Sequence, residues 1–230
     1  MMKINILYED NHLLVTEKPP GILSQADASG APDMLTVIKA YLKETYQKTG
    51  NVFVGLVHRL DRRVGGVMVF AKTSKAASRL SEAIRNREMD KKYLVKVKGL
   101  VEKDGAVTLT IAKDEKEKKA FVAEKGKTSL LYYRVICKNT DTSVLEVDLI
   151  TGRFHQIRLS MMEINHPIVN DYKYDEDQSS TRQELGLWCY QISFPHPISK
   201  EKKTFTLFPT STLWVKELPE IQERLNSRNI

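Results

Sequence analysis

The sequence predicts an α+β fold in which strands outnumber helices. Several stretches alternate apolar and polar residues, as half-buried strands do, and fewer stretches repeat apolar residues at the helical spacing of three and four. The chain has 230 residues, 41% of them hydrophobic, which is enough to bury a sizeable core. No internal repeat and no linker rich in glycine, serine or proline interrupts the sequence, so residues 1–230 are expected to form a single domain.

The first part of the chain is expected to form a hairpin, a turn, a helix and a strand. Residues 4–17 read as two strands around a short polar loop, and the proline pair at 19–20 forces a turn because proline fixes φ and cannot donate to a ladder. Asp33 can cap a helix. An apolar run at 52–57 then predicts a buried strand that leads directly into His58.

The middle of the chain continues with a strand at 67–70 and a helix that Ser74 can cap. Residues 91–98 alternate like a half-buried strand, which places Tyr93 on its apolar face. The mixed-charge run at 114–119 has no apolar stripe and is typical of a solvated hairpin tip or loop. The remaining elements are expected as strands at 130–137, 144–150, 188–194 and 204–208, and as helices at 154–164 and from 211 or 212 to about 225.

Composition narrows the classes of protein. The balance of 36 Lys and Arg against 29 Asp and Glu gives a net charge of +7, which favours polyanionic partners but is shared by many small basic enzymes. Cys137 and Cys189 lie in apolar runs without metal-type spacing, so reduced buried thiols are expected, with no metal site. No apolar run is long enough for a signal peptide core or a membrane span, so we expect a cytoplasmic protein that does not associate with membranes.

The motif His58-Arg59-Leu60-Asp61 carries the strongest chemical signal. An acid between an arginine and the glycines 65–66, at the mouth of a strand, is a candidate nucleophile, because a nearby cation keeps the carboxylate ionised and glycines let a bulky ligand approach the backbone. A second cluster follows at 151–158, with the sequence Thr-Gly-Arg-Phe-His-Gln-Ile-Arg. Lys91-Lys92-Tyr93 lies between the two.

Together these three segments resemble the RluA-type family of RNA pseudouridine synthases. The likeness extends from Lys18, in a Lys-Pro-Pro-Gly turn, to the Phe-Pro-His-Pro sequence that ends at Pro197. The resemblance implies a mixed, largely antiparallel sheet with flanking helices and a central catalytic cleft. It also implies isomerisation of uridine to pseudouridine in structured RNA, ribosomal or transfer, without a cofactor.

Three catalytic residues follow from the resemblance. Asp61 is the implied nucleophile, and Tyr93 would stack on the base and take the proton from the ring carbon that becomes bonded. A lone buried carboxylate would take up a proton, so a cation must compensate, and the family's partner is Arg158, which stays charged and can pair bidentately. The target uracil must be turned out of its stack, at a cost of a few kcal/mol.

The remaining implied site residues contact RNA or support the pocket. Arg59 would reach beside the extruded nucleotide, Ile157 would form an apolar wall, and Arg153 would contact phosphate. His58 and His155 are expected in supporting roles, because neither has a carboxylate at a spacing that would orient it for acid or base work. Lysines that could line the same groove are Lys18, Lys72, Lys91 and Lys92.

The sequence departs from the family pattern at three places. Val64-Gly65 stands where Thr-Ser is common, Ser160 where histidine is common, and Asn170-Asp171 where Gly-Asp is usual. The catalytic pattern begins within the first few residues, so a minimal member without a preceding RNA-binding module is expected. A monomer is also expected, because nothing in the sequence resembles a dimer seam. The RNA affinity would then come from the catalytic cleft and weaken as salt rises.

Two other classes of function compete with this interpretation. A catalytically silent RNA-binding protein on the same scaffold would have no need for an acid at position 61, where it would repel phosphate. A glycosidase or nucleosidase would need a second acid beside Asp61, and none is placed convincingly in the sequence. The retained Asp61 therefore favours the isomerase.

Overall fold

A computed structural model describes residues 4–175 and 184–227. The chain divides into two compact units: unit 1 comprises Met1–Asp90 and Cys189–Leu207, and unit 2 comprises Lys91–Trp188 and Phe208–Ile230. The predicted α+β class is confirmed, because the described residues contain four helices and antiparallel strand pairs in both units. The single catalytic domain and its central cleft stay predictions.

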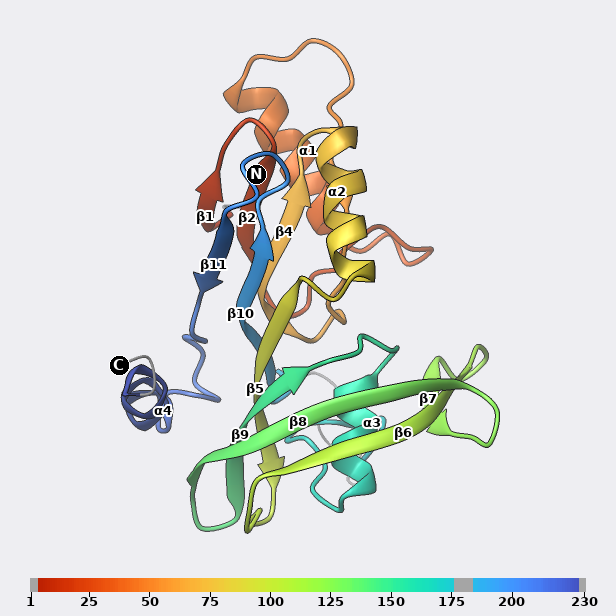
Figure 1. Ribbon diagram of the computed structural model, residues 1–230, viewed down its shortest axis with the longest axis vertical. Coiled ribbons are helices and arrows are strands. Elements are labelled where there is room, and N and C mark those ends of the chain that lie inside the picture. Colours follow the sequence, from red (N-terminus) through yellow and green to blue (C-terminus); the bar gives the residue numbers. More distant parts are fainter. Residues whose placement is uncertain (1–3, 176–183, 228–230) are drawn as a thin grey trace. The chain divides into compact units, whose positions relative to one another are not determined.

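Unit 1 is built on the strand order β1 (Ile6–Glu9), β2 (Leu13–Lys18), β4 (Gly65–Ala71) and β10 (Leu187–Pro195, of which the residues from Cys189 on belong to unit 1), with β11 (Lys202–Thr206) on β10 (Figure 1). The predicted hairpin of β1 and β2 is confirmed. The strand expected at 52–57 contracts to β3 (Gly55–Leu56), which pairs with β4. All seven residues of β4 are buried, so both of its faces must be covered.

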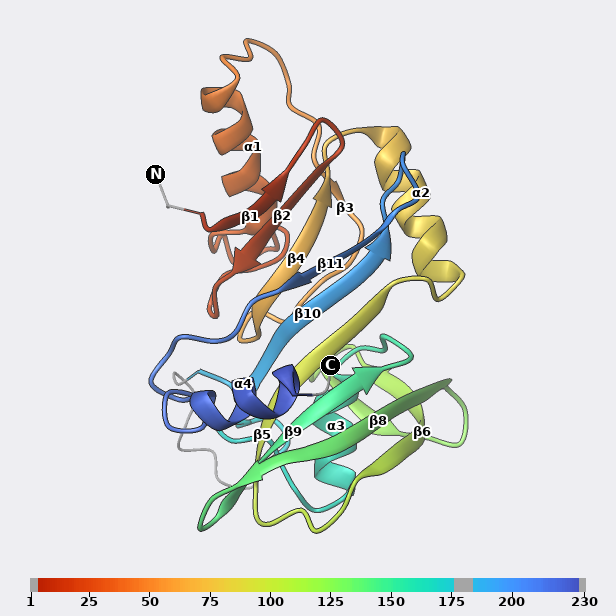
Figure 2. The ribbon, with the colours of Figure 1, turned by 60° about the vertical axis from the view of Figure 1, so that its left-hand side comes forward.

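Two helices cover opposite sides of β2 and β4, as Figure 2 shows. Helix α1 (Met34–Thr45) starts at the predicted N-cap, where Asp33 accepts a hydrogen bond from the Thr36 N–H at 3.1 Å. Helix α2 (Ser74–Arg85) is capped by Thr73, whose Oγ1 accepts from the Ala76 N–H at 3.2 Å, so the cap expected at Ser74 is wrong by one residue. Both are hydroxyl residues, and the sequence did not distinguish them.

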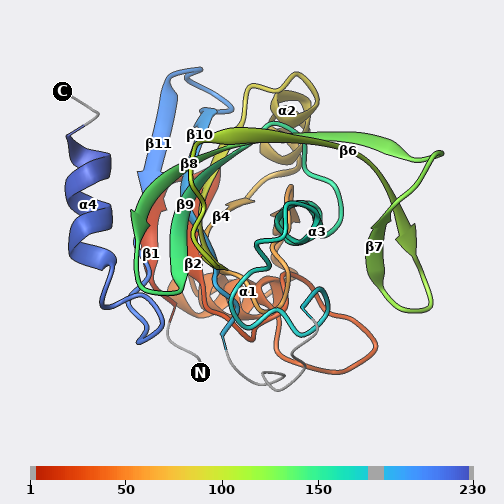
Figure 3. The same ribbon diagram turned by 90° about the horizontal axis from the view of Figure 1, so that it is seen from below.

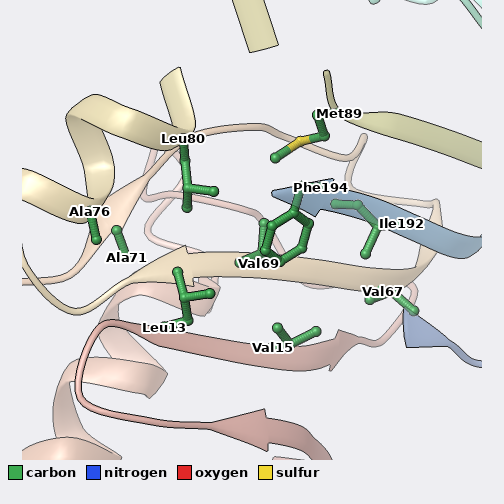
Figure 4. Close-up of a cluster of buried hydrophobic side chains, with 10 residues drawn as sticks. All are labelled: Leu13, Val15, Val67, Val69, Ala71, Ala76, Leu80, Met89, Ile192 and Phe194. Atoms are coloured by element: carbon green, nitrogen blue, oxygen red, sulfur yellow. The ribbon is translucent and has the colours of Figure 1, made fainter. Parts of the chain in front are cut away.

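The core on the α2 side of unit 1 gathers alternate residues of neighbouring strands (Figure 4). Leu13 and Val15 of β2 and Val67 and Val69 of β4 share this face with Leu80 of α2. Phe194 and Ile192 of β10 complete it. At the end of β2, Glu17 and Lys18 pair with Val67 and Gly66 at the start of β4. This register is fixed, because a shift by one residue would turn the buried side chains to the opposite face of the sheet.

Unit 2 contains the strand order β5 (Asp90–Lys98, all but its first residue), β9 (Thr142–Leu149), β8 (Lys127–Lys138), β6 (Gly105–Asp114) and β7 (Lys119–Val122), each pairing antiparallel with its neighbour. Strands β6 and β7 were not predicted from the sequence. The mixed-charge run at 114–119 joins these two strands, so the predicted hairpin tip is confirmed. Strand β8 is longer than predicted because its first residues pair with β6.

Two helices belong to unit 2. Helix α3 (Gln156–Glu163) lies beside β6 and β7 (Figure 3), where Leu159 packs with Ile111, Ala120 and Tyr174. Helix α4 (Leu218–Asn226) contacts β8. It starts six or seven residues later than predicted, and Pro219 supplies the reason, because proline has no N–H to donate to the carbonyl four residues earlier and is tolerated only in the first turn of a helix.

The expectations for the two cysteines and for membrane-spanning segments can be compared with the described residues. Cys137 and Cys189 are buried free thiols, as predicted, and burial raises the pKa of Cys137 to about 11. Within residues 4–175 and 184–227, no helix is long and apolar enough to cross a membrane.

Candidate active site

Asp61 of unit 1 opens a tight turn between β3 and β4. Its backbone carbonyl accepts from the Val64 N–H at 3.0 Å, and its side-chain Oδ1 accepts from the Arg63 N–H at 3.0 Å. This is an Asx turn, in which an aspartate hydrogen-bonds its own backbone two residues on. The carboxylate is half-buried and its orientation is fixed by the turn.

The residues around this turn are anchored to the segment that follows β2. Ser24 Oγ donates to the Leu60 carbonyl at 2.8 Å and accepts from the Leu60 N–H at 3.1 Å. On the other side of Asp61, the Gly21 N–H donates to the Arg62 carbonyl at 2.7 Å and Arg62 Nε donates to the Gly21 carbonyl at 3.0 Å. Two reciprocal pairs therefore bracket Asp61 and hold its backbone.

Lys18 lies fully buried beneath the turn, so the expectation that it lines an RNA groove is wrong. Its Nζ donates to the carbonyls of Pro19 at 3.1 Å, Arg62 at 3.2 Å and Val64 at 2.7 Å, which uses all three ammonium donors. Burial lowers the pKa of Lys18 to about 7, and attraction to Asp61 opposes that shift. Because the attraction is mutual, the ammonium also stabilises the Asp61 carboxylate.

Replacing Lys18 with methionine should lower the free energy of unfolding by about 1–3 kcal/mol, because the carbonyls of Pro19, Arg62 and Val64 each lose a donor and the hydrogen bond to Val64 is fully buried. The loss should depend on pH. Lys18 has a pKa of about 7 when folded and 10.5 as a free group, so between these values the unfolded chain binds more protons and the wild type gains stability as pH rises. Urea unfolding between about pH 6.5 and 9.5 should show this gain relative to the variant. Parallel curves would contradict it, and the exposed Lys39→Met is the control.

The glycines 65–66 are the first residues of β4. Gly66 has φ 130°, and a Cβ there would lie 2.2 Å from the Cys189 carbonyl oxygen and 2.6 Å from its nitrogen. The close approach that requires this glycine is therefore made by the β10 backbone rather than by a ligand.

The other motif residues of unit 1 differ in their environments. His58 is buried, and its Nε2 accepts from the Val69 N–H at 3.1 Å, which requires an unprotonated Nε2 and supports the expected structural role. Arg59 is exposed, as an RNA contact requires. Lys72 pairs with Glu9 at 2.6 Å, with only 10% and 13% of the two side chains exposed. An RNA contact by Lys72 stays a prediction and would have to break this ion pair.

Arg158 of unit 2 is 3% exposed and lies in the first turns of α3. Its Nε donates to Asp171 Oδ2 at 2.8 Å and its Nη2 donates to Asp171 Oδ1 at 2.5 Å, which is a bidentate pair with a carboxylate that is itself fully buried. Nη1 lies 3.2 Å from His155 Nε2, and the guanidinium carbon lies 5.1 Å from the centre of the Tyr174 ring.

Gln156 organises the loop before α3. Its Oε1 accepts from Thr151 Oγ1 at 2.8 Å and from the Arg153 N–H at 3.0 Å, and its Nε2 donates to the Leu130 carbonyl at 3.1 Å. Arg153 is exposed, and its Nε donates to the Thr128 carbonyl at 3.0 Å. Its position suits the predicted phosphate contact, which stays a prediction.

Tyr93 and Ile157 are both buried in unit 2, with 5% of each exposed. Tyr93 lies opposite Val147 on β9, so its predicted place on the apolar face of a strand is confirmed. Lys91 and Lys92 precede it on β5, and Lys92 Nζ lies 3.5 Å from Glu146. The roles of these residues toward RNA stay predictions.

One departure from the family pattern, Asn170, has a structural explanation. Asn170 has φ 65°, a left-handed conformation that suits glycine and that asparagine tolerates better than most residues. Its Nδ2 donates to the Glu184 carbonyl at 2.8 Å. Asparagine at position 170 is therefore compatible with the left-handed backbone of this loop.

Ser160 is fully buried in α3, and its Oγ has no hydrogen-bond partner among the residues that the structure describes. Replacing Ser160 with alanine should leave the free energy of unfolding unchanged or raise it by up to about 1 kcal/mol, because an unsatisfied buried hydroxyl is removed and alanine favours helix. Thermal unfolding of the two proteins measures this. A clear loss of stability would show that the hydroxyl has a partner in solution.

The two halves of the predicted site thus each have a defined local structure. Asp61 and its anchors belong to unit 1, and Tyr93, Ile157 and Arg158 belong to unit 2. The ion pair of Asp61 with Arg158 stays a prediction. In the described part of the chain, no group of three or more His, Cys, Asp or Glu side chains is arranged to hold a metal ion.

Comparison with known proteins assigns the family. A family described as RNA pseudouridylate synthase matches residues 12–163, a segment that contains both motifs. The chain belongs to the RNA pseudouridylate synthase family. Members of this family are isomerases that convert uridine in RNA to pseudouridine, which excludes the glycosidase interpretation for the family as a whole.

Curated pseudouridine synthases are about one-third identical to this chain over most of its length. An uncharacterized RNA pseudouridine synthase of Aquifex aeolicus is 35% identical over 93% of this chain and 73% of its own length. Ribosomal large subunit pseudouridine synthase D of Nitrosomonas europaea is 33% identical over 84% of this chain, and the match spans 59% of that relative. These relatives confirm the RluA-type resemblance. Several of them are much longer than the matched region.

The fold agrees with that of solved pseudouridylate synthases. The structure named human RNA pseudouridylate synthase domain containing 4 superposes with a TM-score of 0.77 at 21% identity, covering 95% of this chain and 93% of that one. Human RNA pseudouridylate synthase domain containing 1 gives a TM-score of 0.71 at 18% identity, over 94% and 95% of the two chains. At these identities the likeness concerns the fold alone.

Sequence reasoning missed three residues of this pseudouridine synthase site. Asp171 was noted only as part of a changed loop, and Gln156 and Tyr174 were not assigned any role. The signal for Gln156 was its place inside the second motif. Asp171 and Tyr174 lie 13 and 16 residues beyond Arg158, and no local pattern in the sequence shows that this segment folds back onto α3.

Proposed function

We propose that this chain converts selected uridines in structured RNA to pseudouridine, with Asp61 as the nucleophile. The observation that carries the proposal is the Asx turn that fixes the Asp61 carboxylate, within the segment that matches the family. The turn is bracketed by the Ser24 and Gly21 hydrogen bonds, and a buried lysine ammonium attracts the carboxylate. A nucleophile needs this combination of fixed direction and retained charge.

In the proposed reaction, Asp61 attacks the target uridine and the bond between ribose and ring nitrogen breaks. The base turns and is rejoined to the ribose through a ring carbon, from which Tyr93 removes the proton. Arg158 pairs with Asp61 and keeps it ionised while water is partly excluded. The proposed reaction consumes no cofactor or outside reagent.

The RNA must present its uridine out of the stack, which costs a few kcal/mol. We propose that Arg59 fills the space beside the extruded nucleotide, since its side chain is exposed next to Asp61 in sequence. Tyr93 and Ile157 would replace the lost stacking contacts with apolar and aromatic surface. Arg153, Lys91 and Lys92 would contact phosphates, so RNA affinity should fall as salt rises.

The target RNA is ribosomal or transfer RNA. Several relatives carry the name ribosomal large subunit pseudouridine synthase D, which favours ribosomal RNA as the first substrate to test. We further propose that the chain acts in the cytoplasm as a monomer with one catalytic domain.

The test uses total RNA from a strain that lacks the protein. Purified enzyme should create new carbodiimide-dependent reverse-transcription stops, and nucleoside mass spectrometry should find the uridine isomer in the same RNA. Ribosomal and transfer RNA are purified and assayed separately to identify the target. If neither RNA acquires pseudouridine, the catalytic proposal fails and a catalytically silent RNA-binding protein becomes the better interpretation.

A further inference from the structure

His155, immediately before α3, adopts an unusual backbone conformation for a histidine. It has φ 51° and ψ 23°, in the left-handed region, and it occupies the N-cap position of α3 without making a side-chain cap hydrogen bond. A residue with a Cβ adopts this conformation at some cost in free energy, so contacts in the folded state must select it. The contacts of its imidazole ring show which interactions stabilise this conformation.

The imidazole bridges two residues from different segments. Its Nε2 lies 3.2 Å from Arg158 Nη1, and its Nδ1 lies 3.0 Å from the Tyr174 hydroxyl. A guanidinium can only donate, so Nε2 must accept and the ring proton must be on Nδ1. His155 is therefore a neutral imidazole that donates to Tyr174 and accepts from Arg158.

The Tyr174 hydroxyl is held in turn by β7. It accepts from the Ala120 N–H at 2.7 Å and donates to the Ala120 carbonyl at 3.2 Å, so each partner has a consistent donor or acceptor role. The Tyr174 ring also faces the Arg158 guanidinium, 5.1 Å from its central carbon. Tyr174 thus links Arg158 to the β6–β7 hairpin by two routes.

Asp171 completes the surroundings of Arg158. Its bidentate pair with Nε and Nη2 fixes the plane of the guanidinium, and its Oδ1 is also within 3.2 Å of the Lys173 N–H. Asp171, His155 and Tyr174 contact one edge, one terminal nitrogen and one face of the same group. Three constraints of this kind leave the guanidinium a single orientation.

We propose that His155, Tyr174 and Asp171 are positioning residues that hold Arg158 in the orientation needed to face Asp61, with His155 acting only as a neutral imidazole. The proposal rests on the proposed function, in which Arg158 supports the ionised nucleophile. It predicts a pH effect: protonation of His155 places an N–H donor against Nη1, repels the guanidinium and releases it. Turnover should then fall on the acid side.

The charged groups around His155 fit this arrangement. Arg158 of α3 approaches Nε2, and Lys119 of β7 lies over the Tyr174 ring at 4.9 Å. Phe154 stacks on the imidazole at 3.9 Å, and Lys113 of β6 lies over Phe154 at 5.0 Å. Two acids belong to this group: Asp171 is paired with Arg158, and Glu115 is paired with Lys113 at 2.5 Å. The Arg158 guanidinium, whose Nη1 lies 3.2 Å from Nε2, disfavours protonation of that nitrogen.

Two substitutions of His155 separate the roles of its ring nitrogens. His155→Asn keeps a donor near the Nδ1 position and tolerates the left-handed backbone, but it lacks the acceptor for Arg158. We expect its kcat to fall about 10–100-fold with little change in KM for RNA, because a misplaced catalytic group costs about that much. His155→Gln can present an acceptor at the Nε2 position, so it should recover most of the loss. It should also lack the acid-side decline due to His155.

Tyr174→Phe keeps the ring but removes the hydroxyl, and it should lower kcat in the same way. Tyr132→Phe, which removes an exposed hydroxyl from β8 of the same unit, is the matched control. Equal kcat and pH profiles for wild type and all His155 and Tyr174 variants would overturn the proposal. So would a glutamine variant that is no better than the asparagine variant.

A second measurement does not depend on catalysis. Nitrogen-15 NMR of the wild-type protein near neutral pH should show His155 protonated on Nδ1 and not on Nε2. An Nε2–H tautomer or an imidazolium would overturn the proposed arrangement. If the NMR result is as expected but the wild type forms no pseudouridine in any RNA tested, the arrangement of residues stands and the proposed function fails.

Discussion

Replacing Asp61 with asparagine should abolish pseudouridine formation while leaving the protein folded. The amide is a very poor nucleophile, so kcat should fall on the order of 10⁴-fold or more. Asparagine has nearly the same shape and its oxygen can still accept from the Arg63 N–H, so the Asx turn should persist. RNA affinity should stay the same or rise, because a negative charge near phosphates is removed. Single-turnover assays and filter binding on the same RNA measure the two quantities.

The matched control for this variant is Asp141→Asn, which makes the same chemical change at an exposed loop position of unit 2. It should keep wild-type turnover. If Asp61→Asn retained turnover within tenfold of the wild type, Asp61 would not be the nucleophile. A loss of RNA binding as large as the loss of turnover would instead indicate that Asp61 organises the RNA site.

Replacing Gly66 with alanine should have the largest effect on stability. The new Cβ would lie 2.2 Å from the Cys189 carbonyl oxygen, and backbone atoms of β10 cannot move aside without separating from β4. The positive φ of 130° adds strain for any residue with a Cβ. We expect a loss of about 3–4 kcal/mol or more, a large share of the 5–15 kcal/mol that holds a typical domain together. Urea unfolding followed by circular dichroism measures it.

Gly50→Ala provides the comparison, because a Cβ at Gly50 would meet nothing within 4 Å. That variant should be as stable as the wild type or slightly more stable, since alanine restricts the unfolded chain. A Gly66→Ala protein as stable as the Gly50→Ala protein would show that β4 and β10 are not so closely spaced in solution.

The fold could be predicted from the sequence where local patterns determine structure. The β1–β2 hairpin and the Asp33 cap follow from alternation and from capping chemistry, and both are present. Strands β6 and β7 were not assigned because the mixed-charge tip between them dominated the pattern of that region. The apolar spacing before Pro219 predicts too early a start for α4, because this spacing does not show the break that the proline introduces.

The candidate site was predicted where a motif is contiguous. Asp61 and Arg158 could be found because each lies in a recognisable run of residues. The partners that fix them could not, because Lys18 is 43 residues from Asp61 and Asp171 reaches Arg158 only through the fold. Burial reversed the interpretation of Lys18 in particular, since a lysine in a turn sequence reads as solvated and this one is fully enclosed.

The Arg158–Asp171 pair has a practical consequence for trapping an RNA complex. Arg158→Met would leave a fully enclosed carboxylate without its counter-ion, which typically costs about 3–5 kcal/mol, so inactivity in that variant would be confounded with misfolding. Inactive protein for crystallography should therefore be prepared at position 61. Where the arginine itself is the question, Arg158→Met is better combined with Asp171→Asn, so that no orphaned charge remains in the interior.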